Sequence, residues 1–271
     1  MIDCFNLEHK VAVLTGASGV LATEIAISLA SVGVRLALLT RDQSNTEKLV
    51  EKVKSMGAEV KAYSCDILSK PSIVQIKESV EHDFGQVDML LNIAGGNLKG
   101  ATIGTDQTIF DISMDDFKKV TELNLHGTVI PSIVFGQLMA KQKKGVIINY
   151  SSMAVDRAIT RVAGYSTSKA AMENFTRWMA VEMALKFGDG IRVNAIAPGF
   201  FVGKQNKSLL INEDGSYTQR AEAILKNTPM GRFGKTEELN GAIQFLCSDA
   251  ASFITGIVLP IDGGFSAFSG V

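Results

Sequence analysis

Short apolar runs alternate with longer amphipathic segments along the whole chain. The runs hold aliphatic and β-branched residues at nearly every position, which is typical of strands buried on both faces of a parallel sheet. They cover residues 11–14, 36–39, 60–65, 87–91, 146–148, 191–196 and 257–259. Between them, apolar residues recur at three- and four-residue spacing, and this spacing predicts helices.

Two of the predicted helices have well-marked ends. The first keeps its apolar spacing from Ile25 to Ala30 and stops at Gly33, whereas the second begins at Pro71 and stops at Gly85. Proline at the start of a helix and glycine just after its end are typical boundaries. We therefore expect an α/β fold: a doubly wound, Rossmann-type sheet of seven parallel strands, joined by right-handed crossovers and covered by helices on both faces.

No internal repeat, low-complexity tract or linker interrupts this pattern, so we expect a single domain over residues 1–271. Ligands of doubly wound sheets bind beyond the carboxyl ends of the strands. Residues 97–113 and 200–220 are irregular and follow the fourth and sixth predicted strands. Both segments are expected at that edge, where they are candidate substrate loops.

Composition and charge narrow the class of protein. Hydrophobic residues make up 46% of the 271 positions, and 27 basic against 28 acidic residues give a net charge of −1. This composition excludes a disordered chain and gives no electrostatic reason to expect a nucleic-acid partner. No apolar run approaches the ~20 residues of a membrane-spanning helix. The first residues also lack the pattern of a signal peptide, so we expect a cytoplasmic protein with no membrane partner.

The three cysteines, Cys4, Cys65 and Cys247, lie far apart in the sequence. They show neither the paired spacing of a disulfide framework nor the spacing of metal ligands. A reducing compartment fits this pattern, and no metal site is expected.

A glycine-containing turn follows the first predicted strand directly. It covers residues 15–22 (TGASGVLA), and helical spacing begins at once. Small residues at this place let a pyrophosphate approach backbone N–H groups at a helix N-terminus. An ordinary strand-to-helix turn also favours Gly and Ser, but the preceding strand and following helix favour dinucleotide binding. The candidate contacts are Gly16, Ser18, Gly19 and Leu21.

The end of the second strand bears on the choice of cofactor. An acidic residue at this end typically bonds the adenosine ribose of NAD, but here the sequence is Thr40-Arg41-Asp42. Thr40 removes the carboxylate that would repel a 2′-phosphate, and Arg41 offers a guanidinium that can bind one. The alternative is a solvated arginine with Asp42 on the ribose. We favour NADP(H) over NAD(H).

A tyrosine and a lysine four residues apart, Tyr165 and Lys169, open a later amphipathic segment, and Ser151 and Ser152 follow the fifth strand. The spacing places Tyr165 and Lys169 on one helical face. A neighbouring ammonium is expected to stabilise the phenolate, lowering the tyrosine pKa towards the range of an acid–base catalyst. By itself, such a pair is more often surface decoration.

At these residues the sequence resembles the short-chain dehydrogenase/reductase family, over essentially the whole chain. Ser152, Tyr165 and Lys169 match the family's serine, tyrosine and lysine at its spacing. Further matching positions are Asp66 after the third strand, Asn92-Ile93-Ala94-Gly95 after the fourth, Asn124 in the segment 123–127, Pro198-Gly199 after the sixth, and Asp262-Gly263-Gly264 near the end. Each match is weak alone, but so many in order are specific.

The resemblance implies a dinucleotide-binding catalytic domain that transfers a hydride between NAD(P)H and a carbonyl or alcohol carbon. Tyr165 would exchange a proton with the substrate oxygen, Ser152 would hydrogen-bond that oxygen, and Lys169 would hold the nicotinamide ribose. Asn124 would fix a water that links Lys169 to solvent. The remaining implied cofactor contacts are Asp66, Ile67, Asn92, Ala94, Gly95, Pro198, Gly199 and Phe201.

Two positions depart from the family's usual pattern. Gly19-Val20-Leu21-Ala22 stands where a later Gly-Ile-Gly is common, so the phosphate contacts are expected to be rearranged. Gly203 stands where many members have a threonine that bonds the carboxamide, and another group would have to supply that contact. His126 is expected to be a packed or surface residue.

The loops resemble the branch of the family that contains D-mannonate oxidoreductases, also called fructuronate reductases. The segments that carry this likeness are 95–97, 197–206, 213–215, 228–234 and 262–271. The branch implies reduction of D-fructuronate to D-mannonate, and a closed site for such a polyol acid needs a cation and several hydrogen-bonding groups. The substrate candidates are Asn97, Arg157, Lys204, Gln205 and Asn206, with Lys99 and Arg161 as further nearby cations. Each cation taken singly is more often solvated surface charge.

The sequence leaves three alternative functions open and also implies an oligomeric state. Within the family, the protein could be a 3-oxoacyl carrier-protein reductase or another sugar or ketogluconate dehydrogenase, and outside enzymology it could be a non-catalytic nucleotide-binding scaffold. The long segments 115–139 and 163–187 match those that pair subunits in the family, which implies a homo-tetramer, with a dimer second.

Overall fold

The computed structural model describes residues 4–203 and 207–270 and confirms the predicted sheet. Seven parallel strands form one sheet in the order β3-β2-β1-β4-β5-β6-β7. The strands are β1 (Val11–Thr15), β2 (Arg35–Thr40), β3 (Val60–Ser64), β4 (Met89–Asn92), β5 (Gly145–Tyr150), β6 (Ile191–Pro198) and β7 (Val258–Ile261). The order reverses between β1 and β4, which is where a doubly wound sheet opens a ligand crevice.

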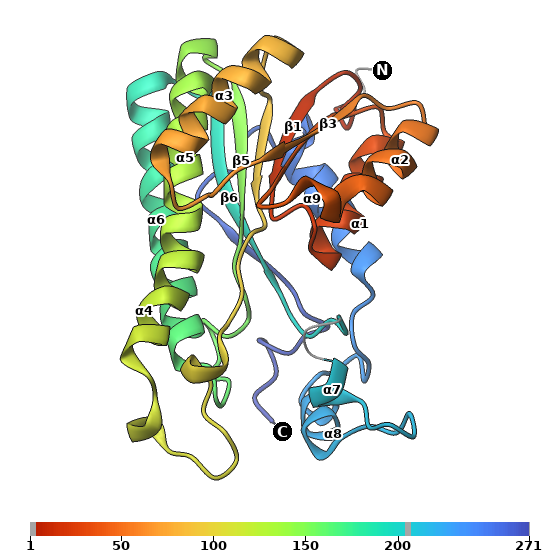
Figure 1. Cartoon of the computed structure of the whole chain (residues 1–271), viewed down its shortest axis with the longest axis vertical. Helices are drawn as coiled ribbons and strands as arrows, with labels where there is room; N and C mark the ends of the chain where they lie inside the picture. The colour runs from red at the N-terminus through yellow and green to blue at the C-terminus, as the bar shows by residue number, and fades with distance from the viewer. Residues whose placement is uncertain (1–3, 204–206, 271) are drawn as a thin grey trace.

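Helices cover both faces of the sheet (Figure 1). One layer holds α1 (Val20–Ser31), α2 (Glu47–Ser55) and α9 (Asn240–Cys247), and the other holds α3 (Lys70–Phe84), α5 (Gly127–Gln142) and α6 (Ala163–Phe187). Successive strand side chains point to opposite faces, so Leu36 and Leu38 join the first core whereas Ala37 and Leu39 join the second. The continuous apolar runs follow from this two-sided burial.

The helix boundaries that the sequence predicts are largely confirmed. The turn after α1 contains Gly33 and α3 is followed directly by Gly85, both with φ of 79°, in the left-handed region that glycine adopts without strain. The Ser69 side chain caps the start of α3, and Pro71 lies in its first turn. The predicted helix over 115–139 differs: α4 (Met114–Thr121) passes into a π-helical turn (Glu122–His126) before α5 begins.

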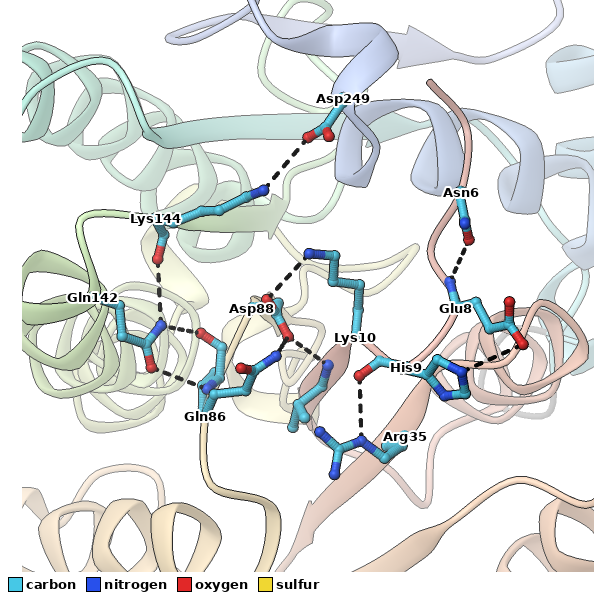
Figure 2. Close-up of polar contacts among 12 residues, drawn as sticks. Asn6, Glu8, His9, Lys10, Arg35, Gln86, Asp88, Gln142, Lys144 and Asp249 are labelled. Carbon is cyan, nitrogen blue, oxygen red and sulfur yellow. Dashed lines mark hydrogen bonds and ion pairs between the residues drawn. The ribbon is translucent and has the colours of Figure 1, made fainter. Parts of the chain in front are cut away.

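Polar side chains at the amino-terminal edge of the sheet link neighbouring elements to one another and take no part in the candidate site. Figure 2 shows them gathered around Asp88, whose carboxylate accepts from Val11 N and Gln86 Nε2, both at 2.8 Å, and lies 3.6 Å from Lys10 Nζ. Gln142 exchanges hydrogen bonds with the backbone of Val87. These contacts tie the starts of β1 and β4 to the end of α5.

The carboxyl edge carries the longer loops, as predicted. In Figure 1 the segment between β4 and α4 and the segment with α7 (Lys207–Leu210) and α8 (Gln219–Lys226) extend beyond this edge, with the C-terminus between them. The stretch 97–113 contains only short 3₁₀ turns, whereas 200–220 is more ordered than predicted, because it holds α7 and the first turn of α8. No helix in the described parts of the chain is long and apolar enough to cross a membrane.

Candidate active site

The turn between β1 and α1 has the form that a pyrophosphate requires. Gly16 has φ of 67°, and a Cβ atom there would lie 2.8 Å from the Ala94 Cα atom, so only glycine fits. Gly19 is the N-cap of α1, and no side chain caps the first-turn N–H groups. Ser18 and Gly19 are exposed, and Leu21 is half-buried. This open helix start beside a glycine cradle fits a dinucleotide phosphate.

At the end of β2, the two candidate contacts of the adenosine ribose, Arg41 and Asp42, have different surroundings. Asp42 uses its carboxylate locally: Oδ1 accepts from the N–H and hydroxyl of Ser44, and Oδ2 accepts from Asn45. Thr40 is buried, and its hydroxyl donates to the Asp42 carbonyl. Arg41 is exposed, and no described side chain contacts its guanidinium. The structure therefore leaves Arg41 available where Asp42 is occupied.

Residues after β3 and β4 border the same crevice. Asp66 is exposed and bends the chain by accepting from Leu68 N, while Ile67 packs against the α-carbon of Gly127. Gly95 lies close to two polar side chains. A Cβ atom there would lie 2.7 Å from Asn124 Oδ1 and 3.2 Å from Lys169 Nζ. The absence of that Cβ leaves Asn124 and Lys169 facing the backbone turn that follows β4.

The side chain of Asn92 points into the protein. Its amide donates to Ser132 Oγ at 2.9 Å and Asn149 Oδ1 at 2.8 Å, and Asn149 in turn donates to Thr176. All four side chains are buried. Asn92 thus joins β4 and β5 to helices α5 and α6 through its side chain.

Asn124 lies in the π-helical turn and is fully buried. Its amide nitrogen donates to Gly96 O and Val120 O at 2.8 Å each, and its Oδ1 accepts from Gly96 N at 3.1 Å. The widened turn allows one side chain to satisfy its own helix and hold the backbone at Gly96 together. Asn124 thereby fixes the strand-end turn next to Lys169.

Ser152, Tyr165 and Lys169 lie together where β5 ends and α6 begins. Ser152 follows β5, whereas Tyr165 and Lys169 lie one turn apart at the start of α6. Lys169 is buried and its ammonium donates to the Tyr150 carbonyl at 2.5 Å, with Nζ 5.6 Å from the centre of the Tyr165 ring. A hydrogen bond links Tyr165 to Ser152. The three side chains therefore form one group at the carboxyl edge.

The protonation of this group differs from the sequence-based prediction. Burial raises the pKa of Tyr165 above that of an ordinary phenol, and the hydrogen bond with Ser152 offsets only part of this rise. Burial also lowers the pKa of Lys169 to about 8. The sequence predicts a net acidification of Tyr165 by Lys169, but in the structure desolvation of the phenol dominates. Tyr165 is therefore protonated at neutral pH, as a proton donor must be.

The end of β6 closes the other side of the site. Pro198 is buried, and a Cβ atom on Gly199 would lie 2.7 Å from the Asp262 Cα atom, so the chain can pass Asp262 only as glycine. The Phe201 ring covers Gly234. A cavity of about 360 Å³ opens here, lined by Phe200 and Phe201, by residues of the segment 228–238 and by residues 260–264. Phe200, Phe201 and Met230 give it apolar walls, whereas Arg232, Glu238 and Asp262 are polar lining residues.

Comparison with known proteins agrees with this geometry. The family model described as enoyl-(acyl carrier protein) reductase matches residues 16–266. The chain belongs to the short-chain dehydrogenase/reductase family. It is an NAD(P)-dependent oxidoreductase that acts on a small-molecule substrate.

Three relatives are similar to this family member over its full length. An uncharacterized oxidoreductase named UxuB from Bacillus subtilis is 43% identical over 98% of both chains. A crystal structure from Haemophilus influenzae, with bound NAD and provisionally assigned as a D-mannonate oxidoreductase, is 42% identical over 98% of both chains, with a TM-score of 0.92. A 2-dehydro-3-deoxy-D-gluconate 5-dehydrogenase from Pseudoalteromonas atlantica is 33% identical and covers 98% of this chain and 99% of its own.

The described candidate substrate residues, Asn97 and Arg157, each form hydrogen bonds within the protein. Asn97 is exposed and bonds within its own loop, to Thr102 Oγ1 at 2.9 Å. Arg157 donates through Nε and Nη2 to Ser266 O and through Nη2 to Phe268 O, so its guanidinium fastens the C-terminal tail. Three further candidates, Lys204, Gln205 and Asn206, lie outside the described residues.

Sequence reasoning missed one buried carboxylate beside the candidate group of Ser152, Tyr165 and Lys169. Glu173 is 2% exposed; its Oε1 accepts from Ser151 Oγ at 2.5 Å, and its Oε2 accepts from Arg177 Nη2 at 3.1 Å. Glu173 lies four residues after Lys169, on the face that also carries Tyr165. That spacing is the signal that could have found it. Glu173 ties the end of β5, next to Ser152, to α6.

Proposed function

We propose that this enzyme interconverts D-fructuronate and D-mannonate. The observation that carries the proposal is the full-length likeness, at 42% identity, to the Haemophilus structure provisionally assigned as a D-mannonate oxidoreductase. The cluster at the carboxyl edge of the sheet supplies the groups that such a reaction needs. Bound NAD(P)H would give a hydride to the ketone carbon while the substrate oxygen takes a proton, leaving NAD(P)⁺ and the alcohol.

Each residue of the site has a proposed part in this reaction. Tyr165 donates the proton to the substrate oxygen, and Ser152 hydrogen-bonds the same oxygen and orients it. Lys169 faces the turn at Gly95, where it holds the cofactor ribose. Asn124 keeps that turn in place, and with it the path from Lys169 to solvent. The remaining proposed cofactor contacts are Gly16, Ser18, Gly19, Leu21, Thr40, Arg41, Asp66, Ile67, Asn92, Ala94, Pro198, Gly199 and Phe201.

We propose that NADP(H) is preferred over NAD(H). The support is local. The Arg41 guanidinium has no hydrogen-bond or ion-pair partner among the described residues, and the Asp42 carboxylate is engaged by Ser44 and Asn45. A 2′-phosphate would therefore meet a cation rather than a carboxylate. The bound NAD of the Haemophilus relative makes NAD(H) the alternative.

One structural feature favours a second substrate class. Phe200, Phe201 and Met230 line the cavity beside the end of β6, and apolar walls suit an acyl chain. Reduction of a 3-oxoacyl thioester is therefore the alternative function.

The assembly and location of the enzyme are also proposals. Three large side chains on α6 are exposed, Trp178 at 63%, Val181 at 58% and Leu185 at 77%, and their spacing places them on one helix face. Such a face supports the proposed homo-tetramer, with α5 and α6 pairing between subunits. Cys4, Cys65 and Cys247 are all free thiols, which supports the cytoplasm as the place of action.

The test is a panel of carbonyl substrates assayed with both reduced cofactors. D-fructuronate, a ketogluconate and an acetoacetyl thioester are each offered with NADPH and NADH, and we expect the highest kcat/KM with D-fructuronate and NADPH. Tyr165→Phe should lower kcat at least about 100-fold because the proton donor is lost. Tyr63→Phe, on β3 and bonded to Asp83, is the matched control and should leave kcat unchanged. Preference for the thioester, or a Tyr165→Phe rate within a few-fold of wild type, would contradict the proposal.

A further inference from the structure

Two arginines, Arg161 and Arg220, lie near each other at the carboxyl edge without an acidic partner. Arg161 lies in the segment between Ser152 and Tyr165, and Arg220 lies in the first turn of α8. Both side chains are half-buried. By contrast Arg35, Arg177 and Arg232 each pair with a glutamate. Among the described residues, no carboxylate forms an ion pair with Arg161 or Arg220.

Arg161 is held in place by the loop that follows β4. Its Nε donates to Ile103 O at 2.7 Å, and its carbonyl accepts from Ile103 N at 3.0 Å. Its φ is 81°, a conformation that a non-glycine residue adopts only when its surroundings impose it. One bond uses Nε and the other the backbone carbonyl, so both terminal Nη groups of the guanidinium keep their donors.

Arg220 reaches the same place from the opposite loop. Its Nη1 donates to Thr160 Oγ1 at 3.2 Å, directly beside Arg161. Burial, and to a smaller extent the charge of Arg161, lower the pKa of Arg220. This effect agrees with the hydrogen bond that places Arg220 at the residue before Arg161. The segments 97–113 and 200–220, which the sequence predicts as substrate loops, therefore meet at Thr160 and Arg161.

Two arginines brought to the same short segment, with guanidinium donors left over and no acidic partner among the described residues, favour an anion there. We propose that Arg161 and Arg220 together bind the carboxylate of the sugar-acid substrate. This inference rests on the proposed function, because D-fructuronate carries its ketone and its carboxylate towards opposite ends of the carbon chain. With the ketone at Tyr165, the carboxylate extends outward towards the loops, and there the arginine pair distinguishes the acid from the neutral ketose.

The test compares an acid with its neutral counterpart in matched variants. D-fructuronate and D-fructose differ by a carboxylate in place of a hydroxymethyl group, so the ratio of their kcat/KM values reports recognition of the charge. Arg220→Gln should lower kcat/KM for D-fructuronate about 10- to 100-fold, as expected for one lost charge-assisted hydrogen bond. The value for D-fructose should change less than about twofold, because the variant spares the uncharged part of the site.

Two further variants separate this role from a merely structural one. Arg220→Lys keeps the charge and should recover part of the lost selectivity. Lys226→Gln removes one positive charge from the exposed last turn of the same helix and should leave both substrates unchanged. As a readout without turnover, NADPH-loaded enzyme is titrated with D-mannonate and D-mannitol, and Arg220→Gln should weaken only the binding of D-mannonate.

The outcomes distinguish the two proposals. Suppose that the wild-type enzyme reduces D-fructuronate but Arg220→Gln lowers kcat/KM equally for D-fructuronate and D-fructose, or for neither. The proposed carboxylate site at Arg161 and Arg220 is then wrong, while the proposed function stands. If wild type does not reduce D-fructuronate, the function is wrong, and the same variants are compared with 5-ketogluconate and L-sorbose, the next acid and neutral ketose. Wild-type preference for the neutral member of that pair overturns the arginine site as well.

Discussion

Lys169 links the chemistry of the site to its burial. The same burial that removes its ammonium from water lowers its pKa to about 8, and the Tyr150 carbonyl is its only described hydrogen-bond acceptor. Tyr165 shifts in the opposite direction because a buried phenolate is disfavoured. The pair is thus charged lysine and neutral tyrosine at neutral pH, which is the state suited to carbonyl reduction.

The pH dependence of reduction should follow Lys169. Below about pH 8 Lys169 is protonated, and above it the charge is lost while Tyr165 keeps its proton, so kcat/KM for reduction should fall above about pH 8. Lys169→Arg keeps its charge throughout, so this fall should vanish, with a lower kcat from the altered shape. Initial rates measured between about pH 6 and pH 10 test this dependence, because that range brackets the pKa of Lys169 of about 8. An identical inflection in Lys169→Arg would assign it to another group.

At the scale of elements, the two edges of the sheet do different work. At the amino edge, Asp88 joins β1 and β4 through backbone and side-chain bonds (Figure 2), whereas Ser152 follows the carboxyl end of β5. At the carboxyl edge, Glu173 joins β5 to α6 directly beside Ser152. Both carboxylates hold elements together, but only the second also positions a proposed catalytic side chain.

Replacing each carboxylate with alanine should separate stability from activity. Glu173→Ala and Asp88→Ala should each lower the free energy of unfolding by about 1–3 kcal/mol, because donors lose their acceptor. Glu173→Ala should also lower kcat, since Ser151 and hence Ser152 lose their anchor, and Glu173→Gln should restore part of it. Asp88→Ala should leave kcat unchanged. Urea denaturation and steady-state rates measure both effects; unchanged kcat in Glu173→Ala would leave Glu173 a purely structural role.

At the scale of the whole molecule, the outer face of α6 exposes large apolar side chains to solvent. Trp178, Val181 and Leu185 are exposed on one face of a helix whose other face is well packed in the core beside α5. Such large apolar side chains are typical of an interface between subunits. This exposed face supports the proposed homo-tetramer alongside the likeness to the family.

Disrupting that face should dissociate the assembly. Trp178→Glu combined with Leu185→Glu places charges in the proposed interface, and we expect the mass from light scattering to fall from tetramer to dimer or monomer at micromolar concentration. Lys52→Glu, on α2 of the opposite layer, introduces a comparable charge and should leave the mass unchanged. A wild-type monomer at this concentration would contradict the proposal.

The sequence by itself determined the sheet and most helix boundaries. Burial of parallel strands on both faces forces continuous apolar runs, and Pro71, Gly33 and Gly85 act through local backbone geometry. These signals are local, so they survive without knowledge of the fold. Spacing alone places Tyr165 and Lys169 on one helical face, whereas the proposed roles of Ser152, Tyr165 and Lys169 come from the resemblance to the family.

Only the tertiary structure decided which side chains meet. The π-helical turn at Asn124, the Glu173 bond to Ser151, the fastening of the C-terminal tail by Arg157 and the approach of Arg161 to Arg220 all join segments that are distant in sequence or whose geometry depends on packing. The direction of the Tyr165 pKa shift belongs to the same class, because burial is set by the fold rather than by the neighbouring lysine. Spacing places residues on a face, whereas the three-dimensional packing of loops and helices sets their contacts and their solvation.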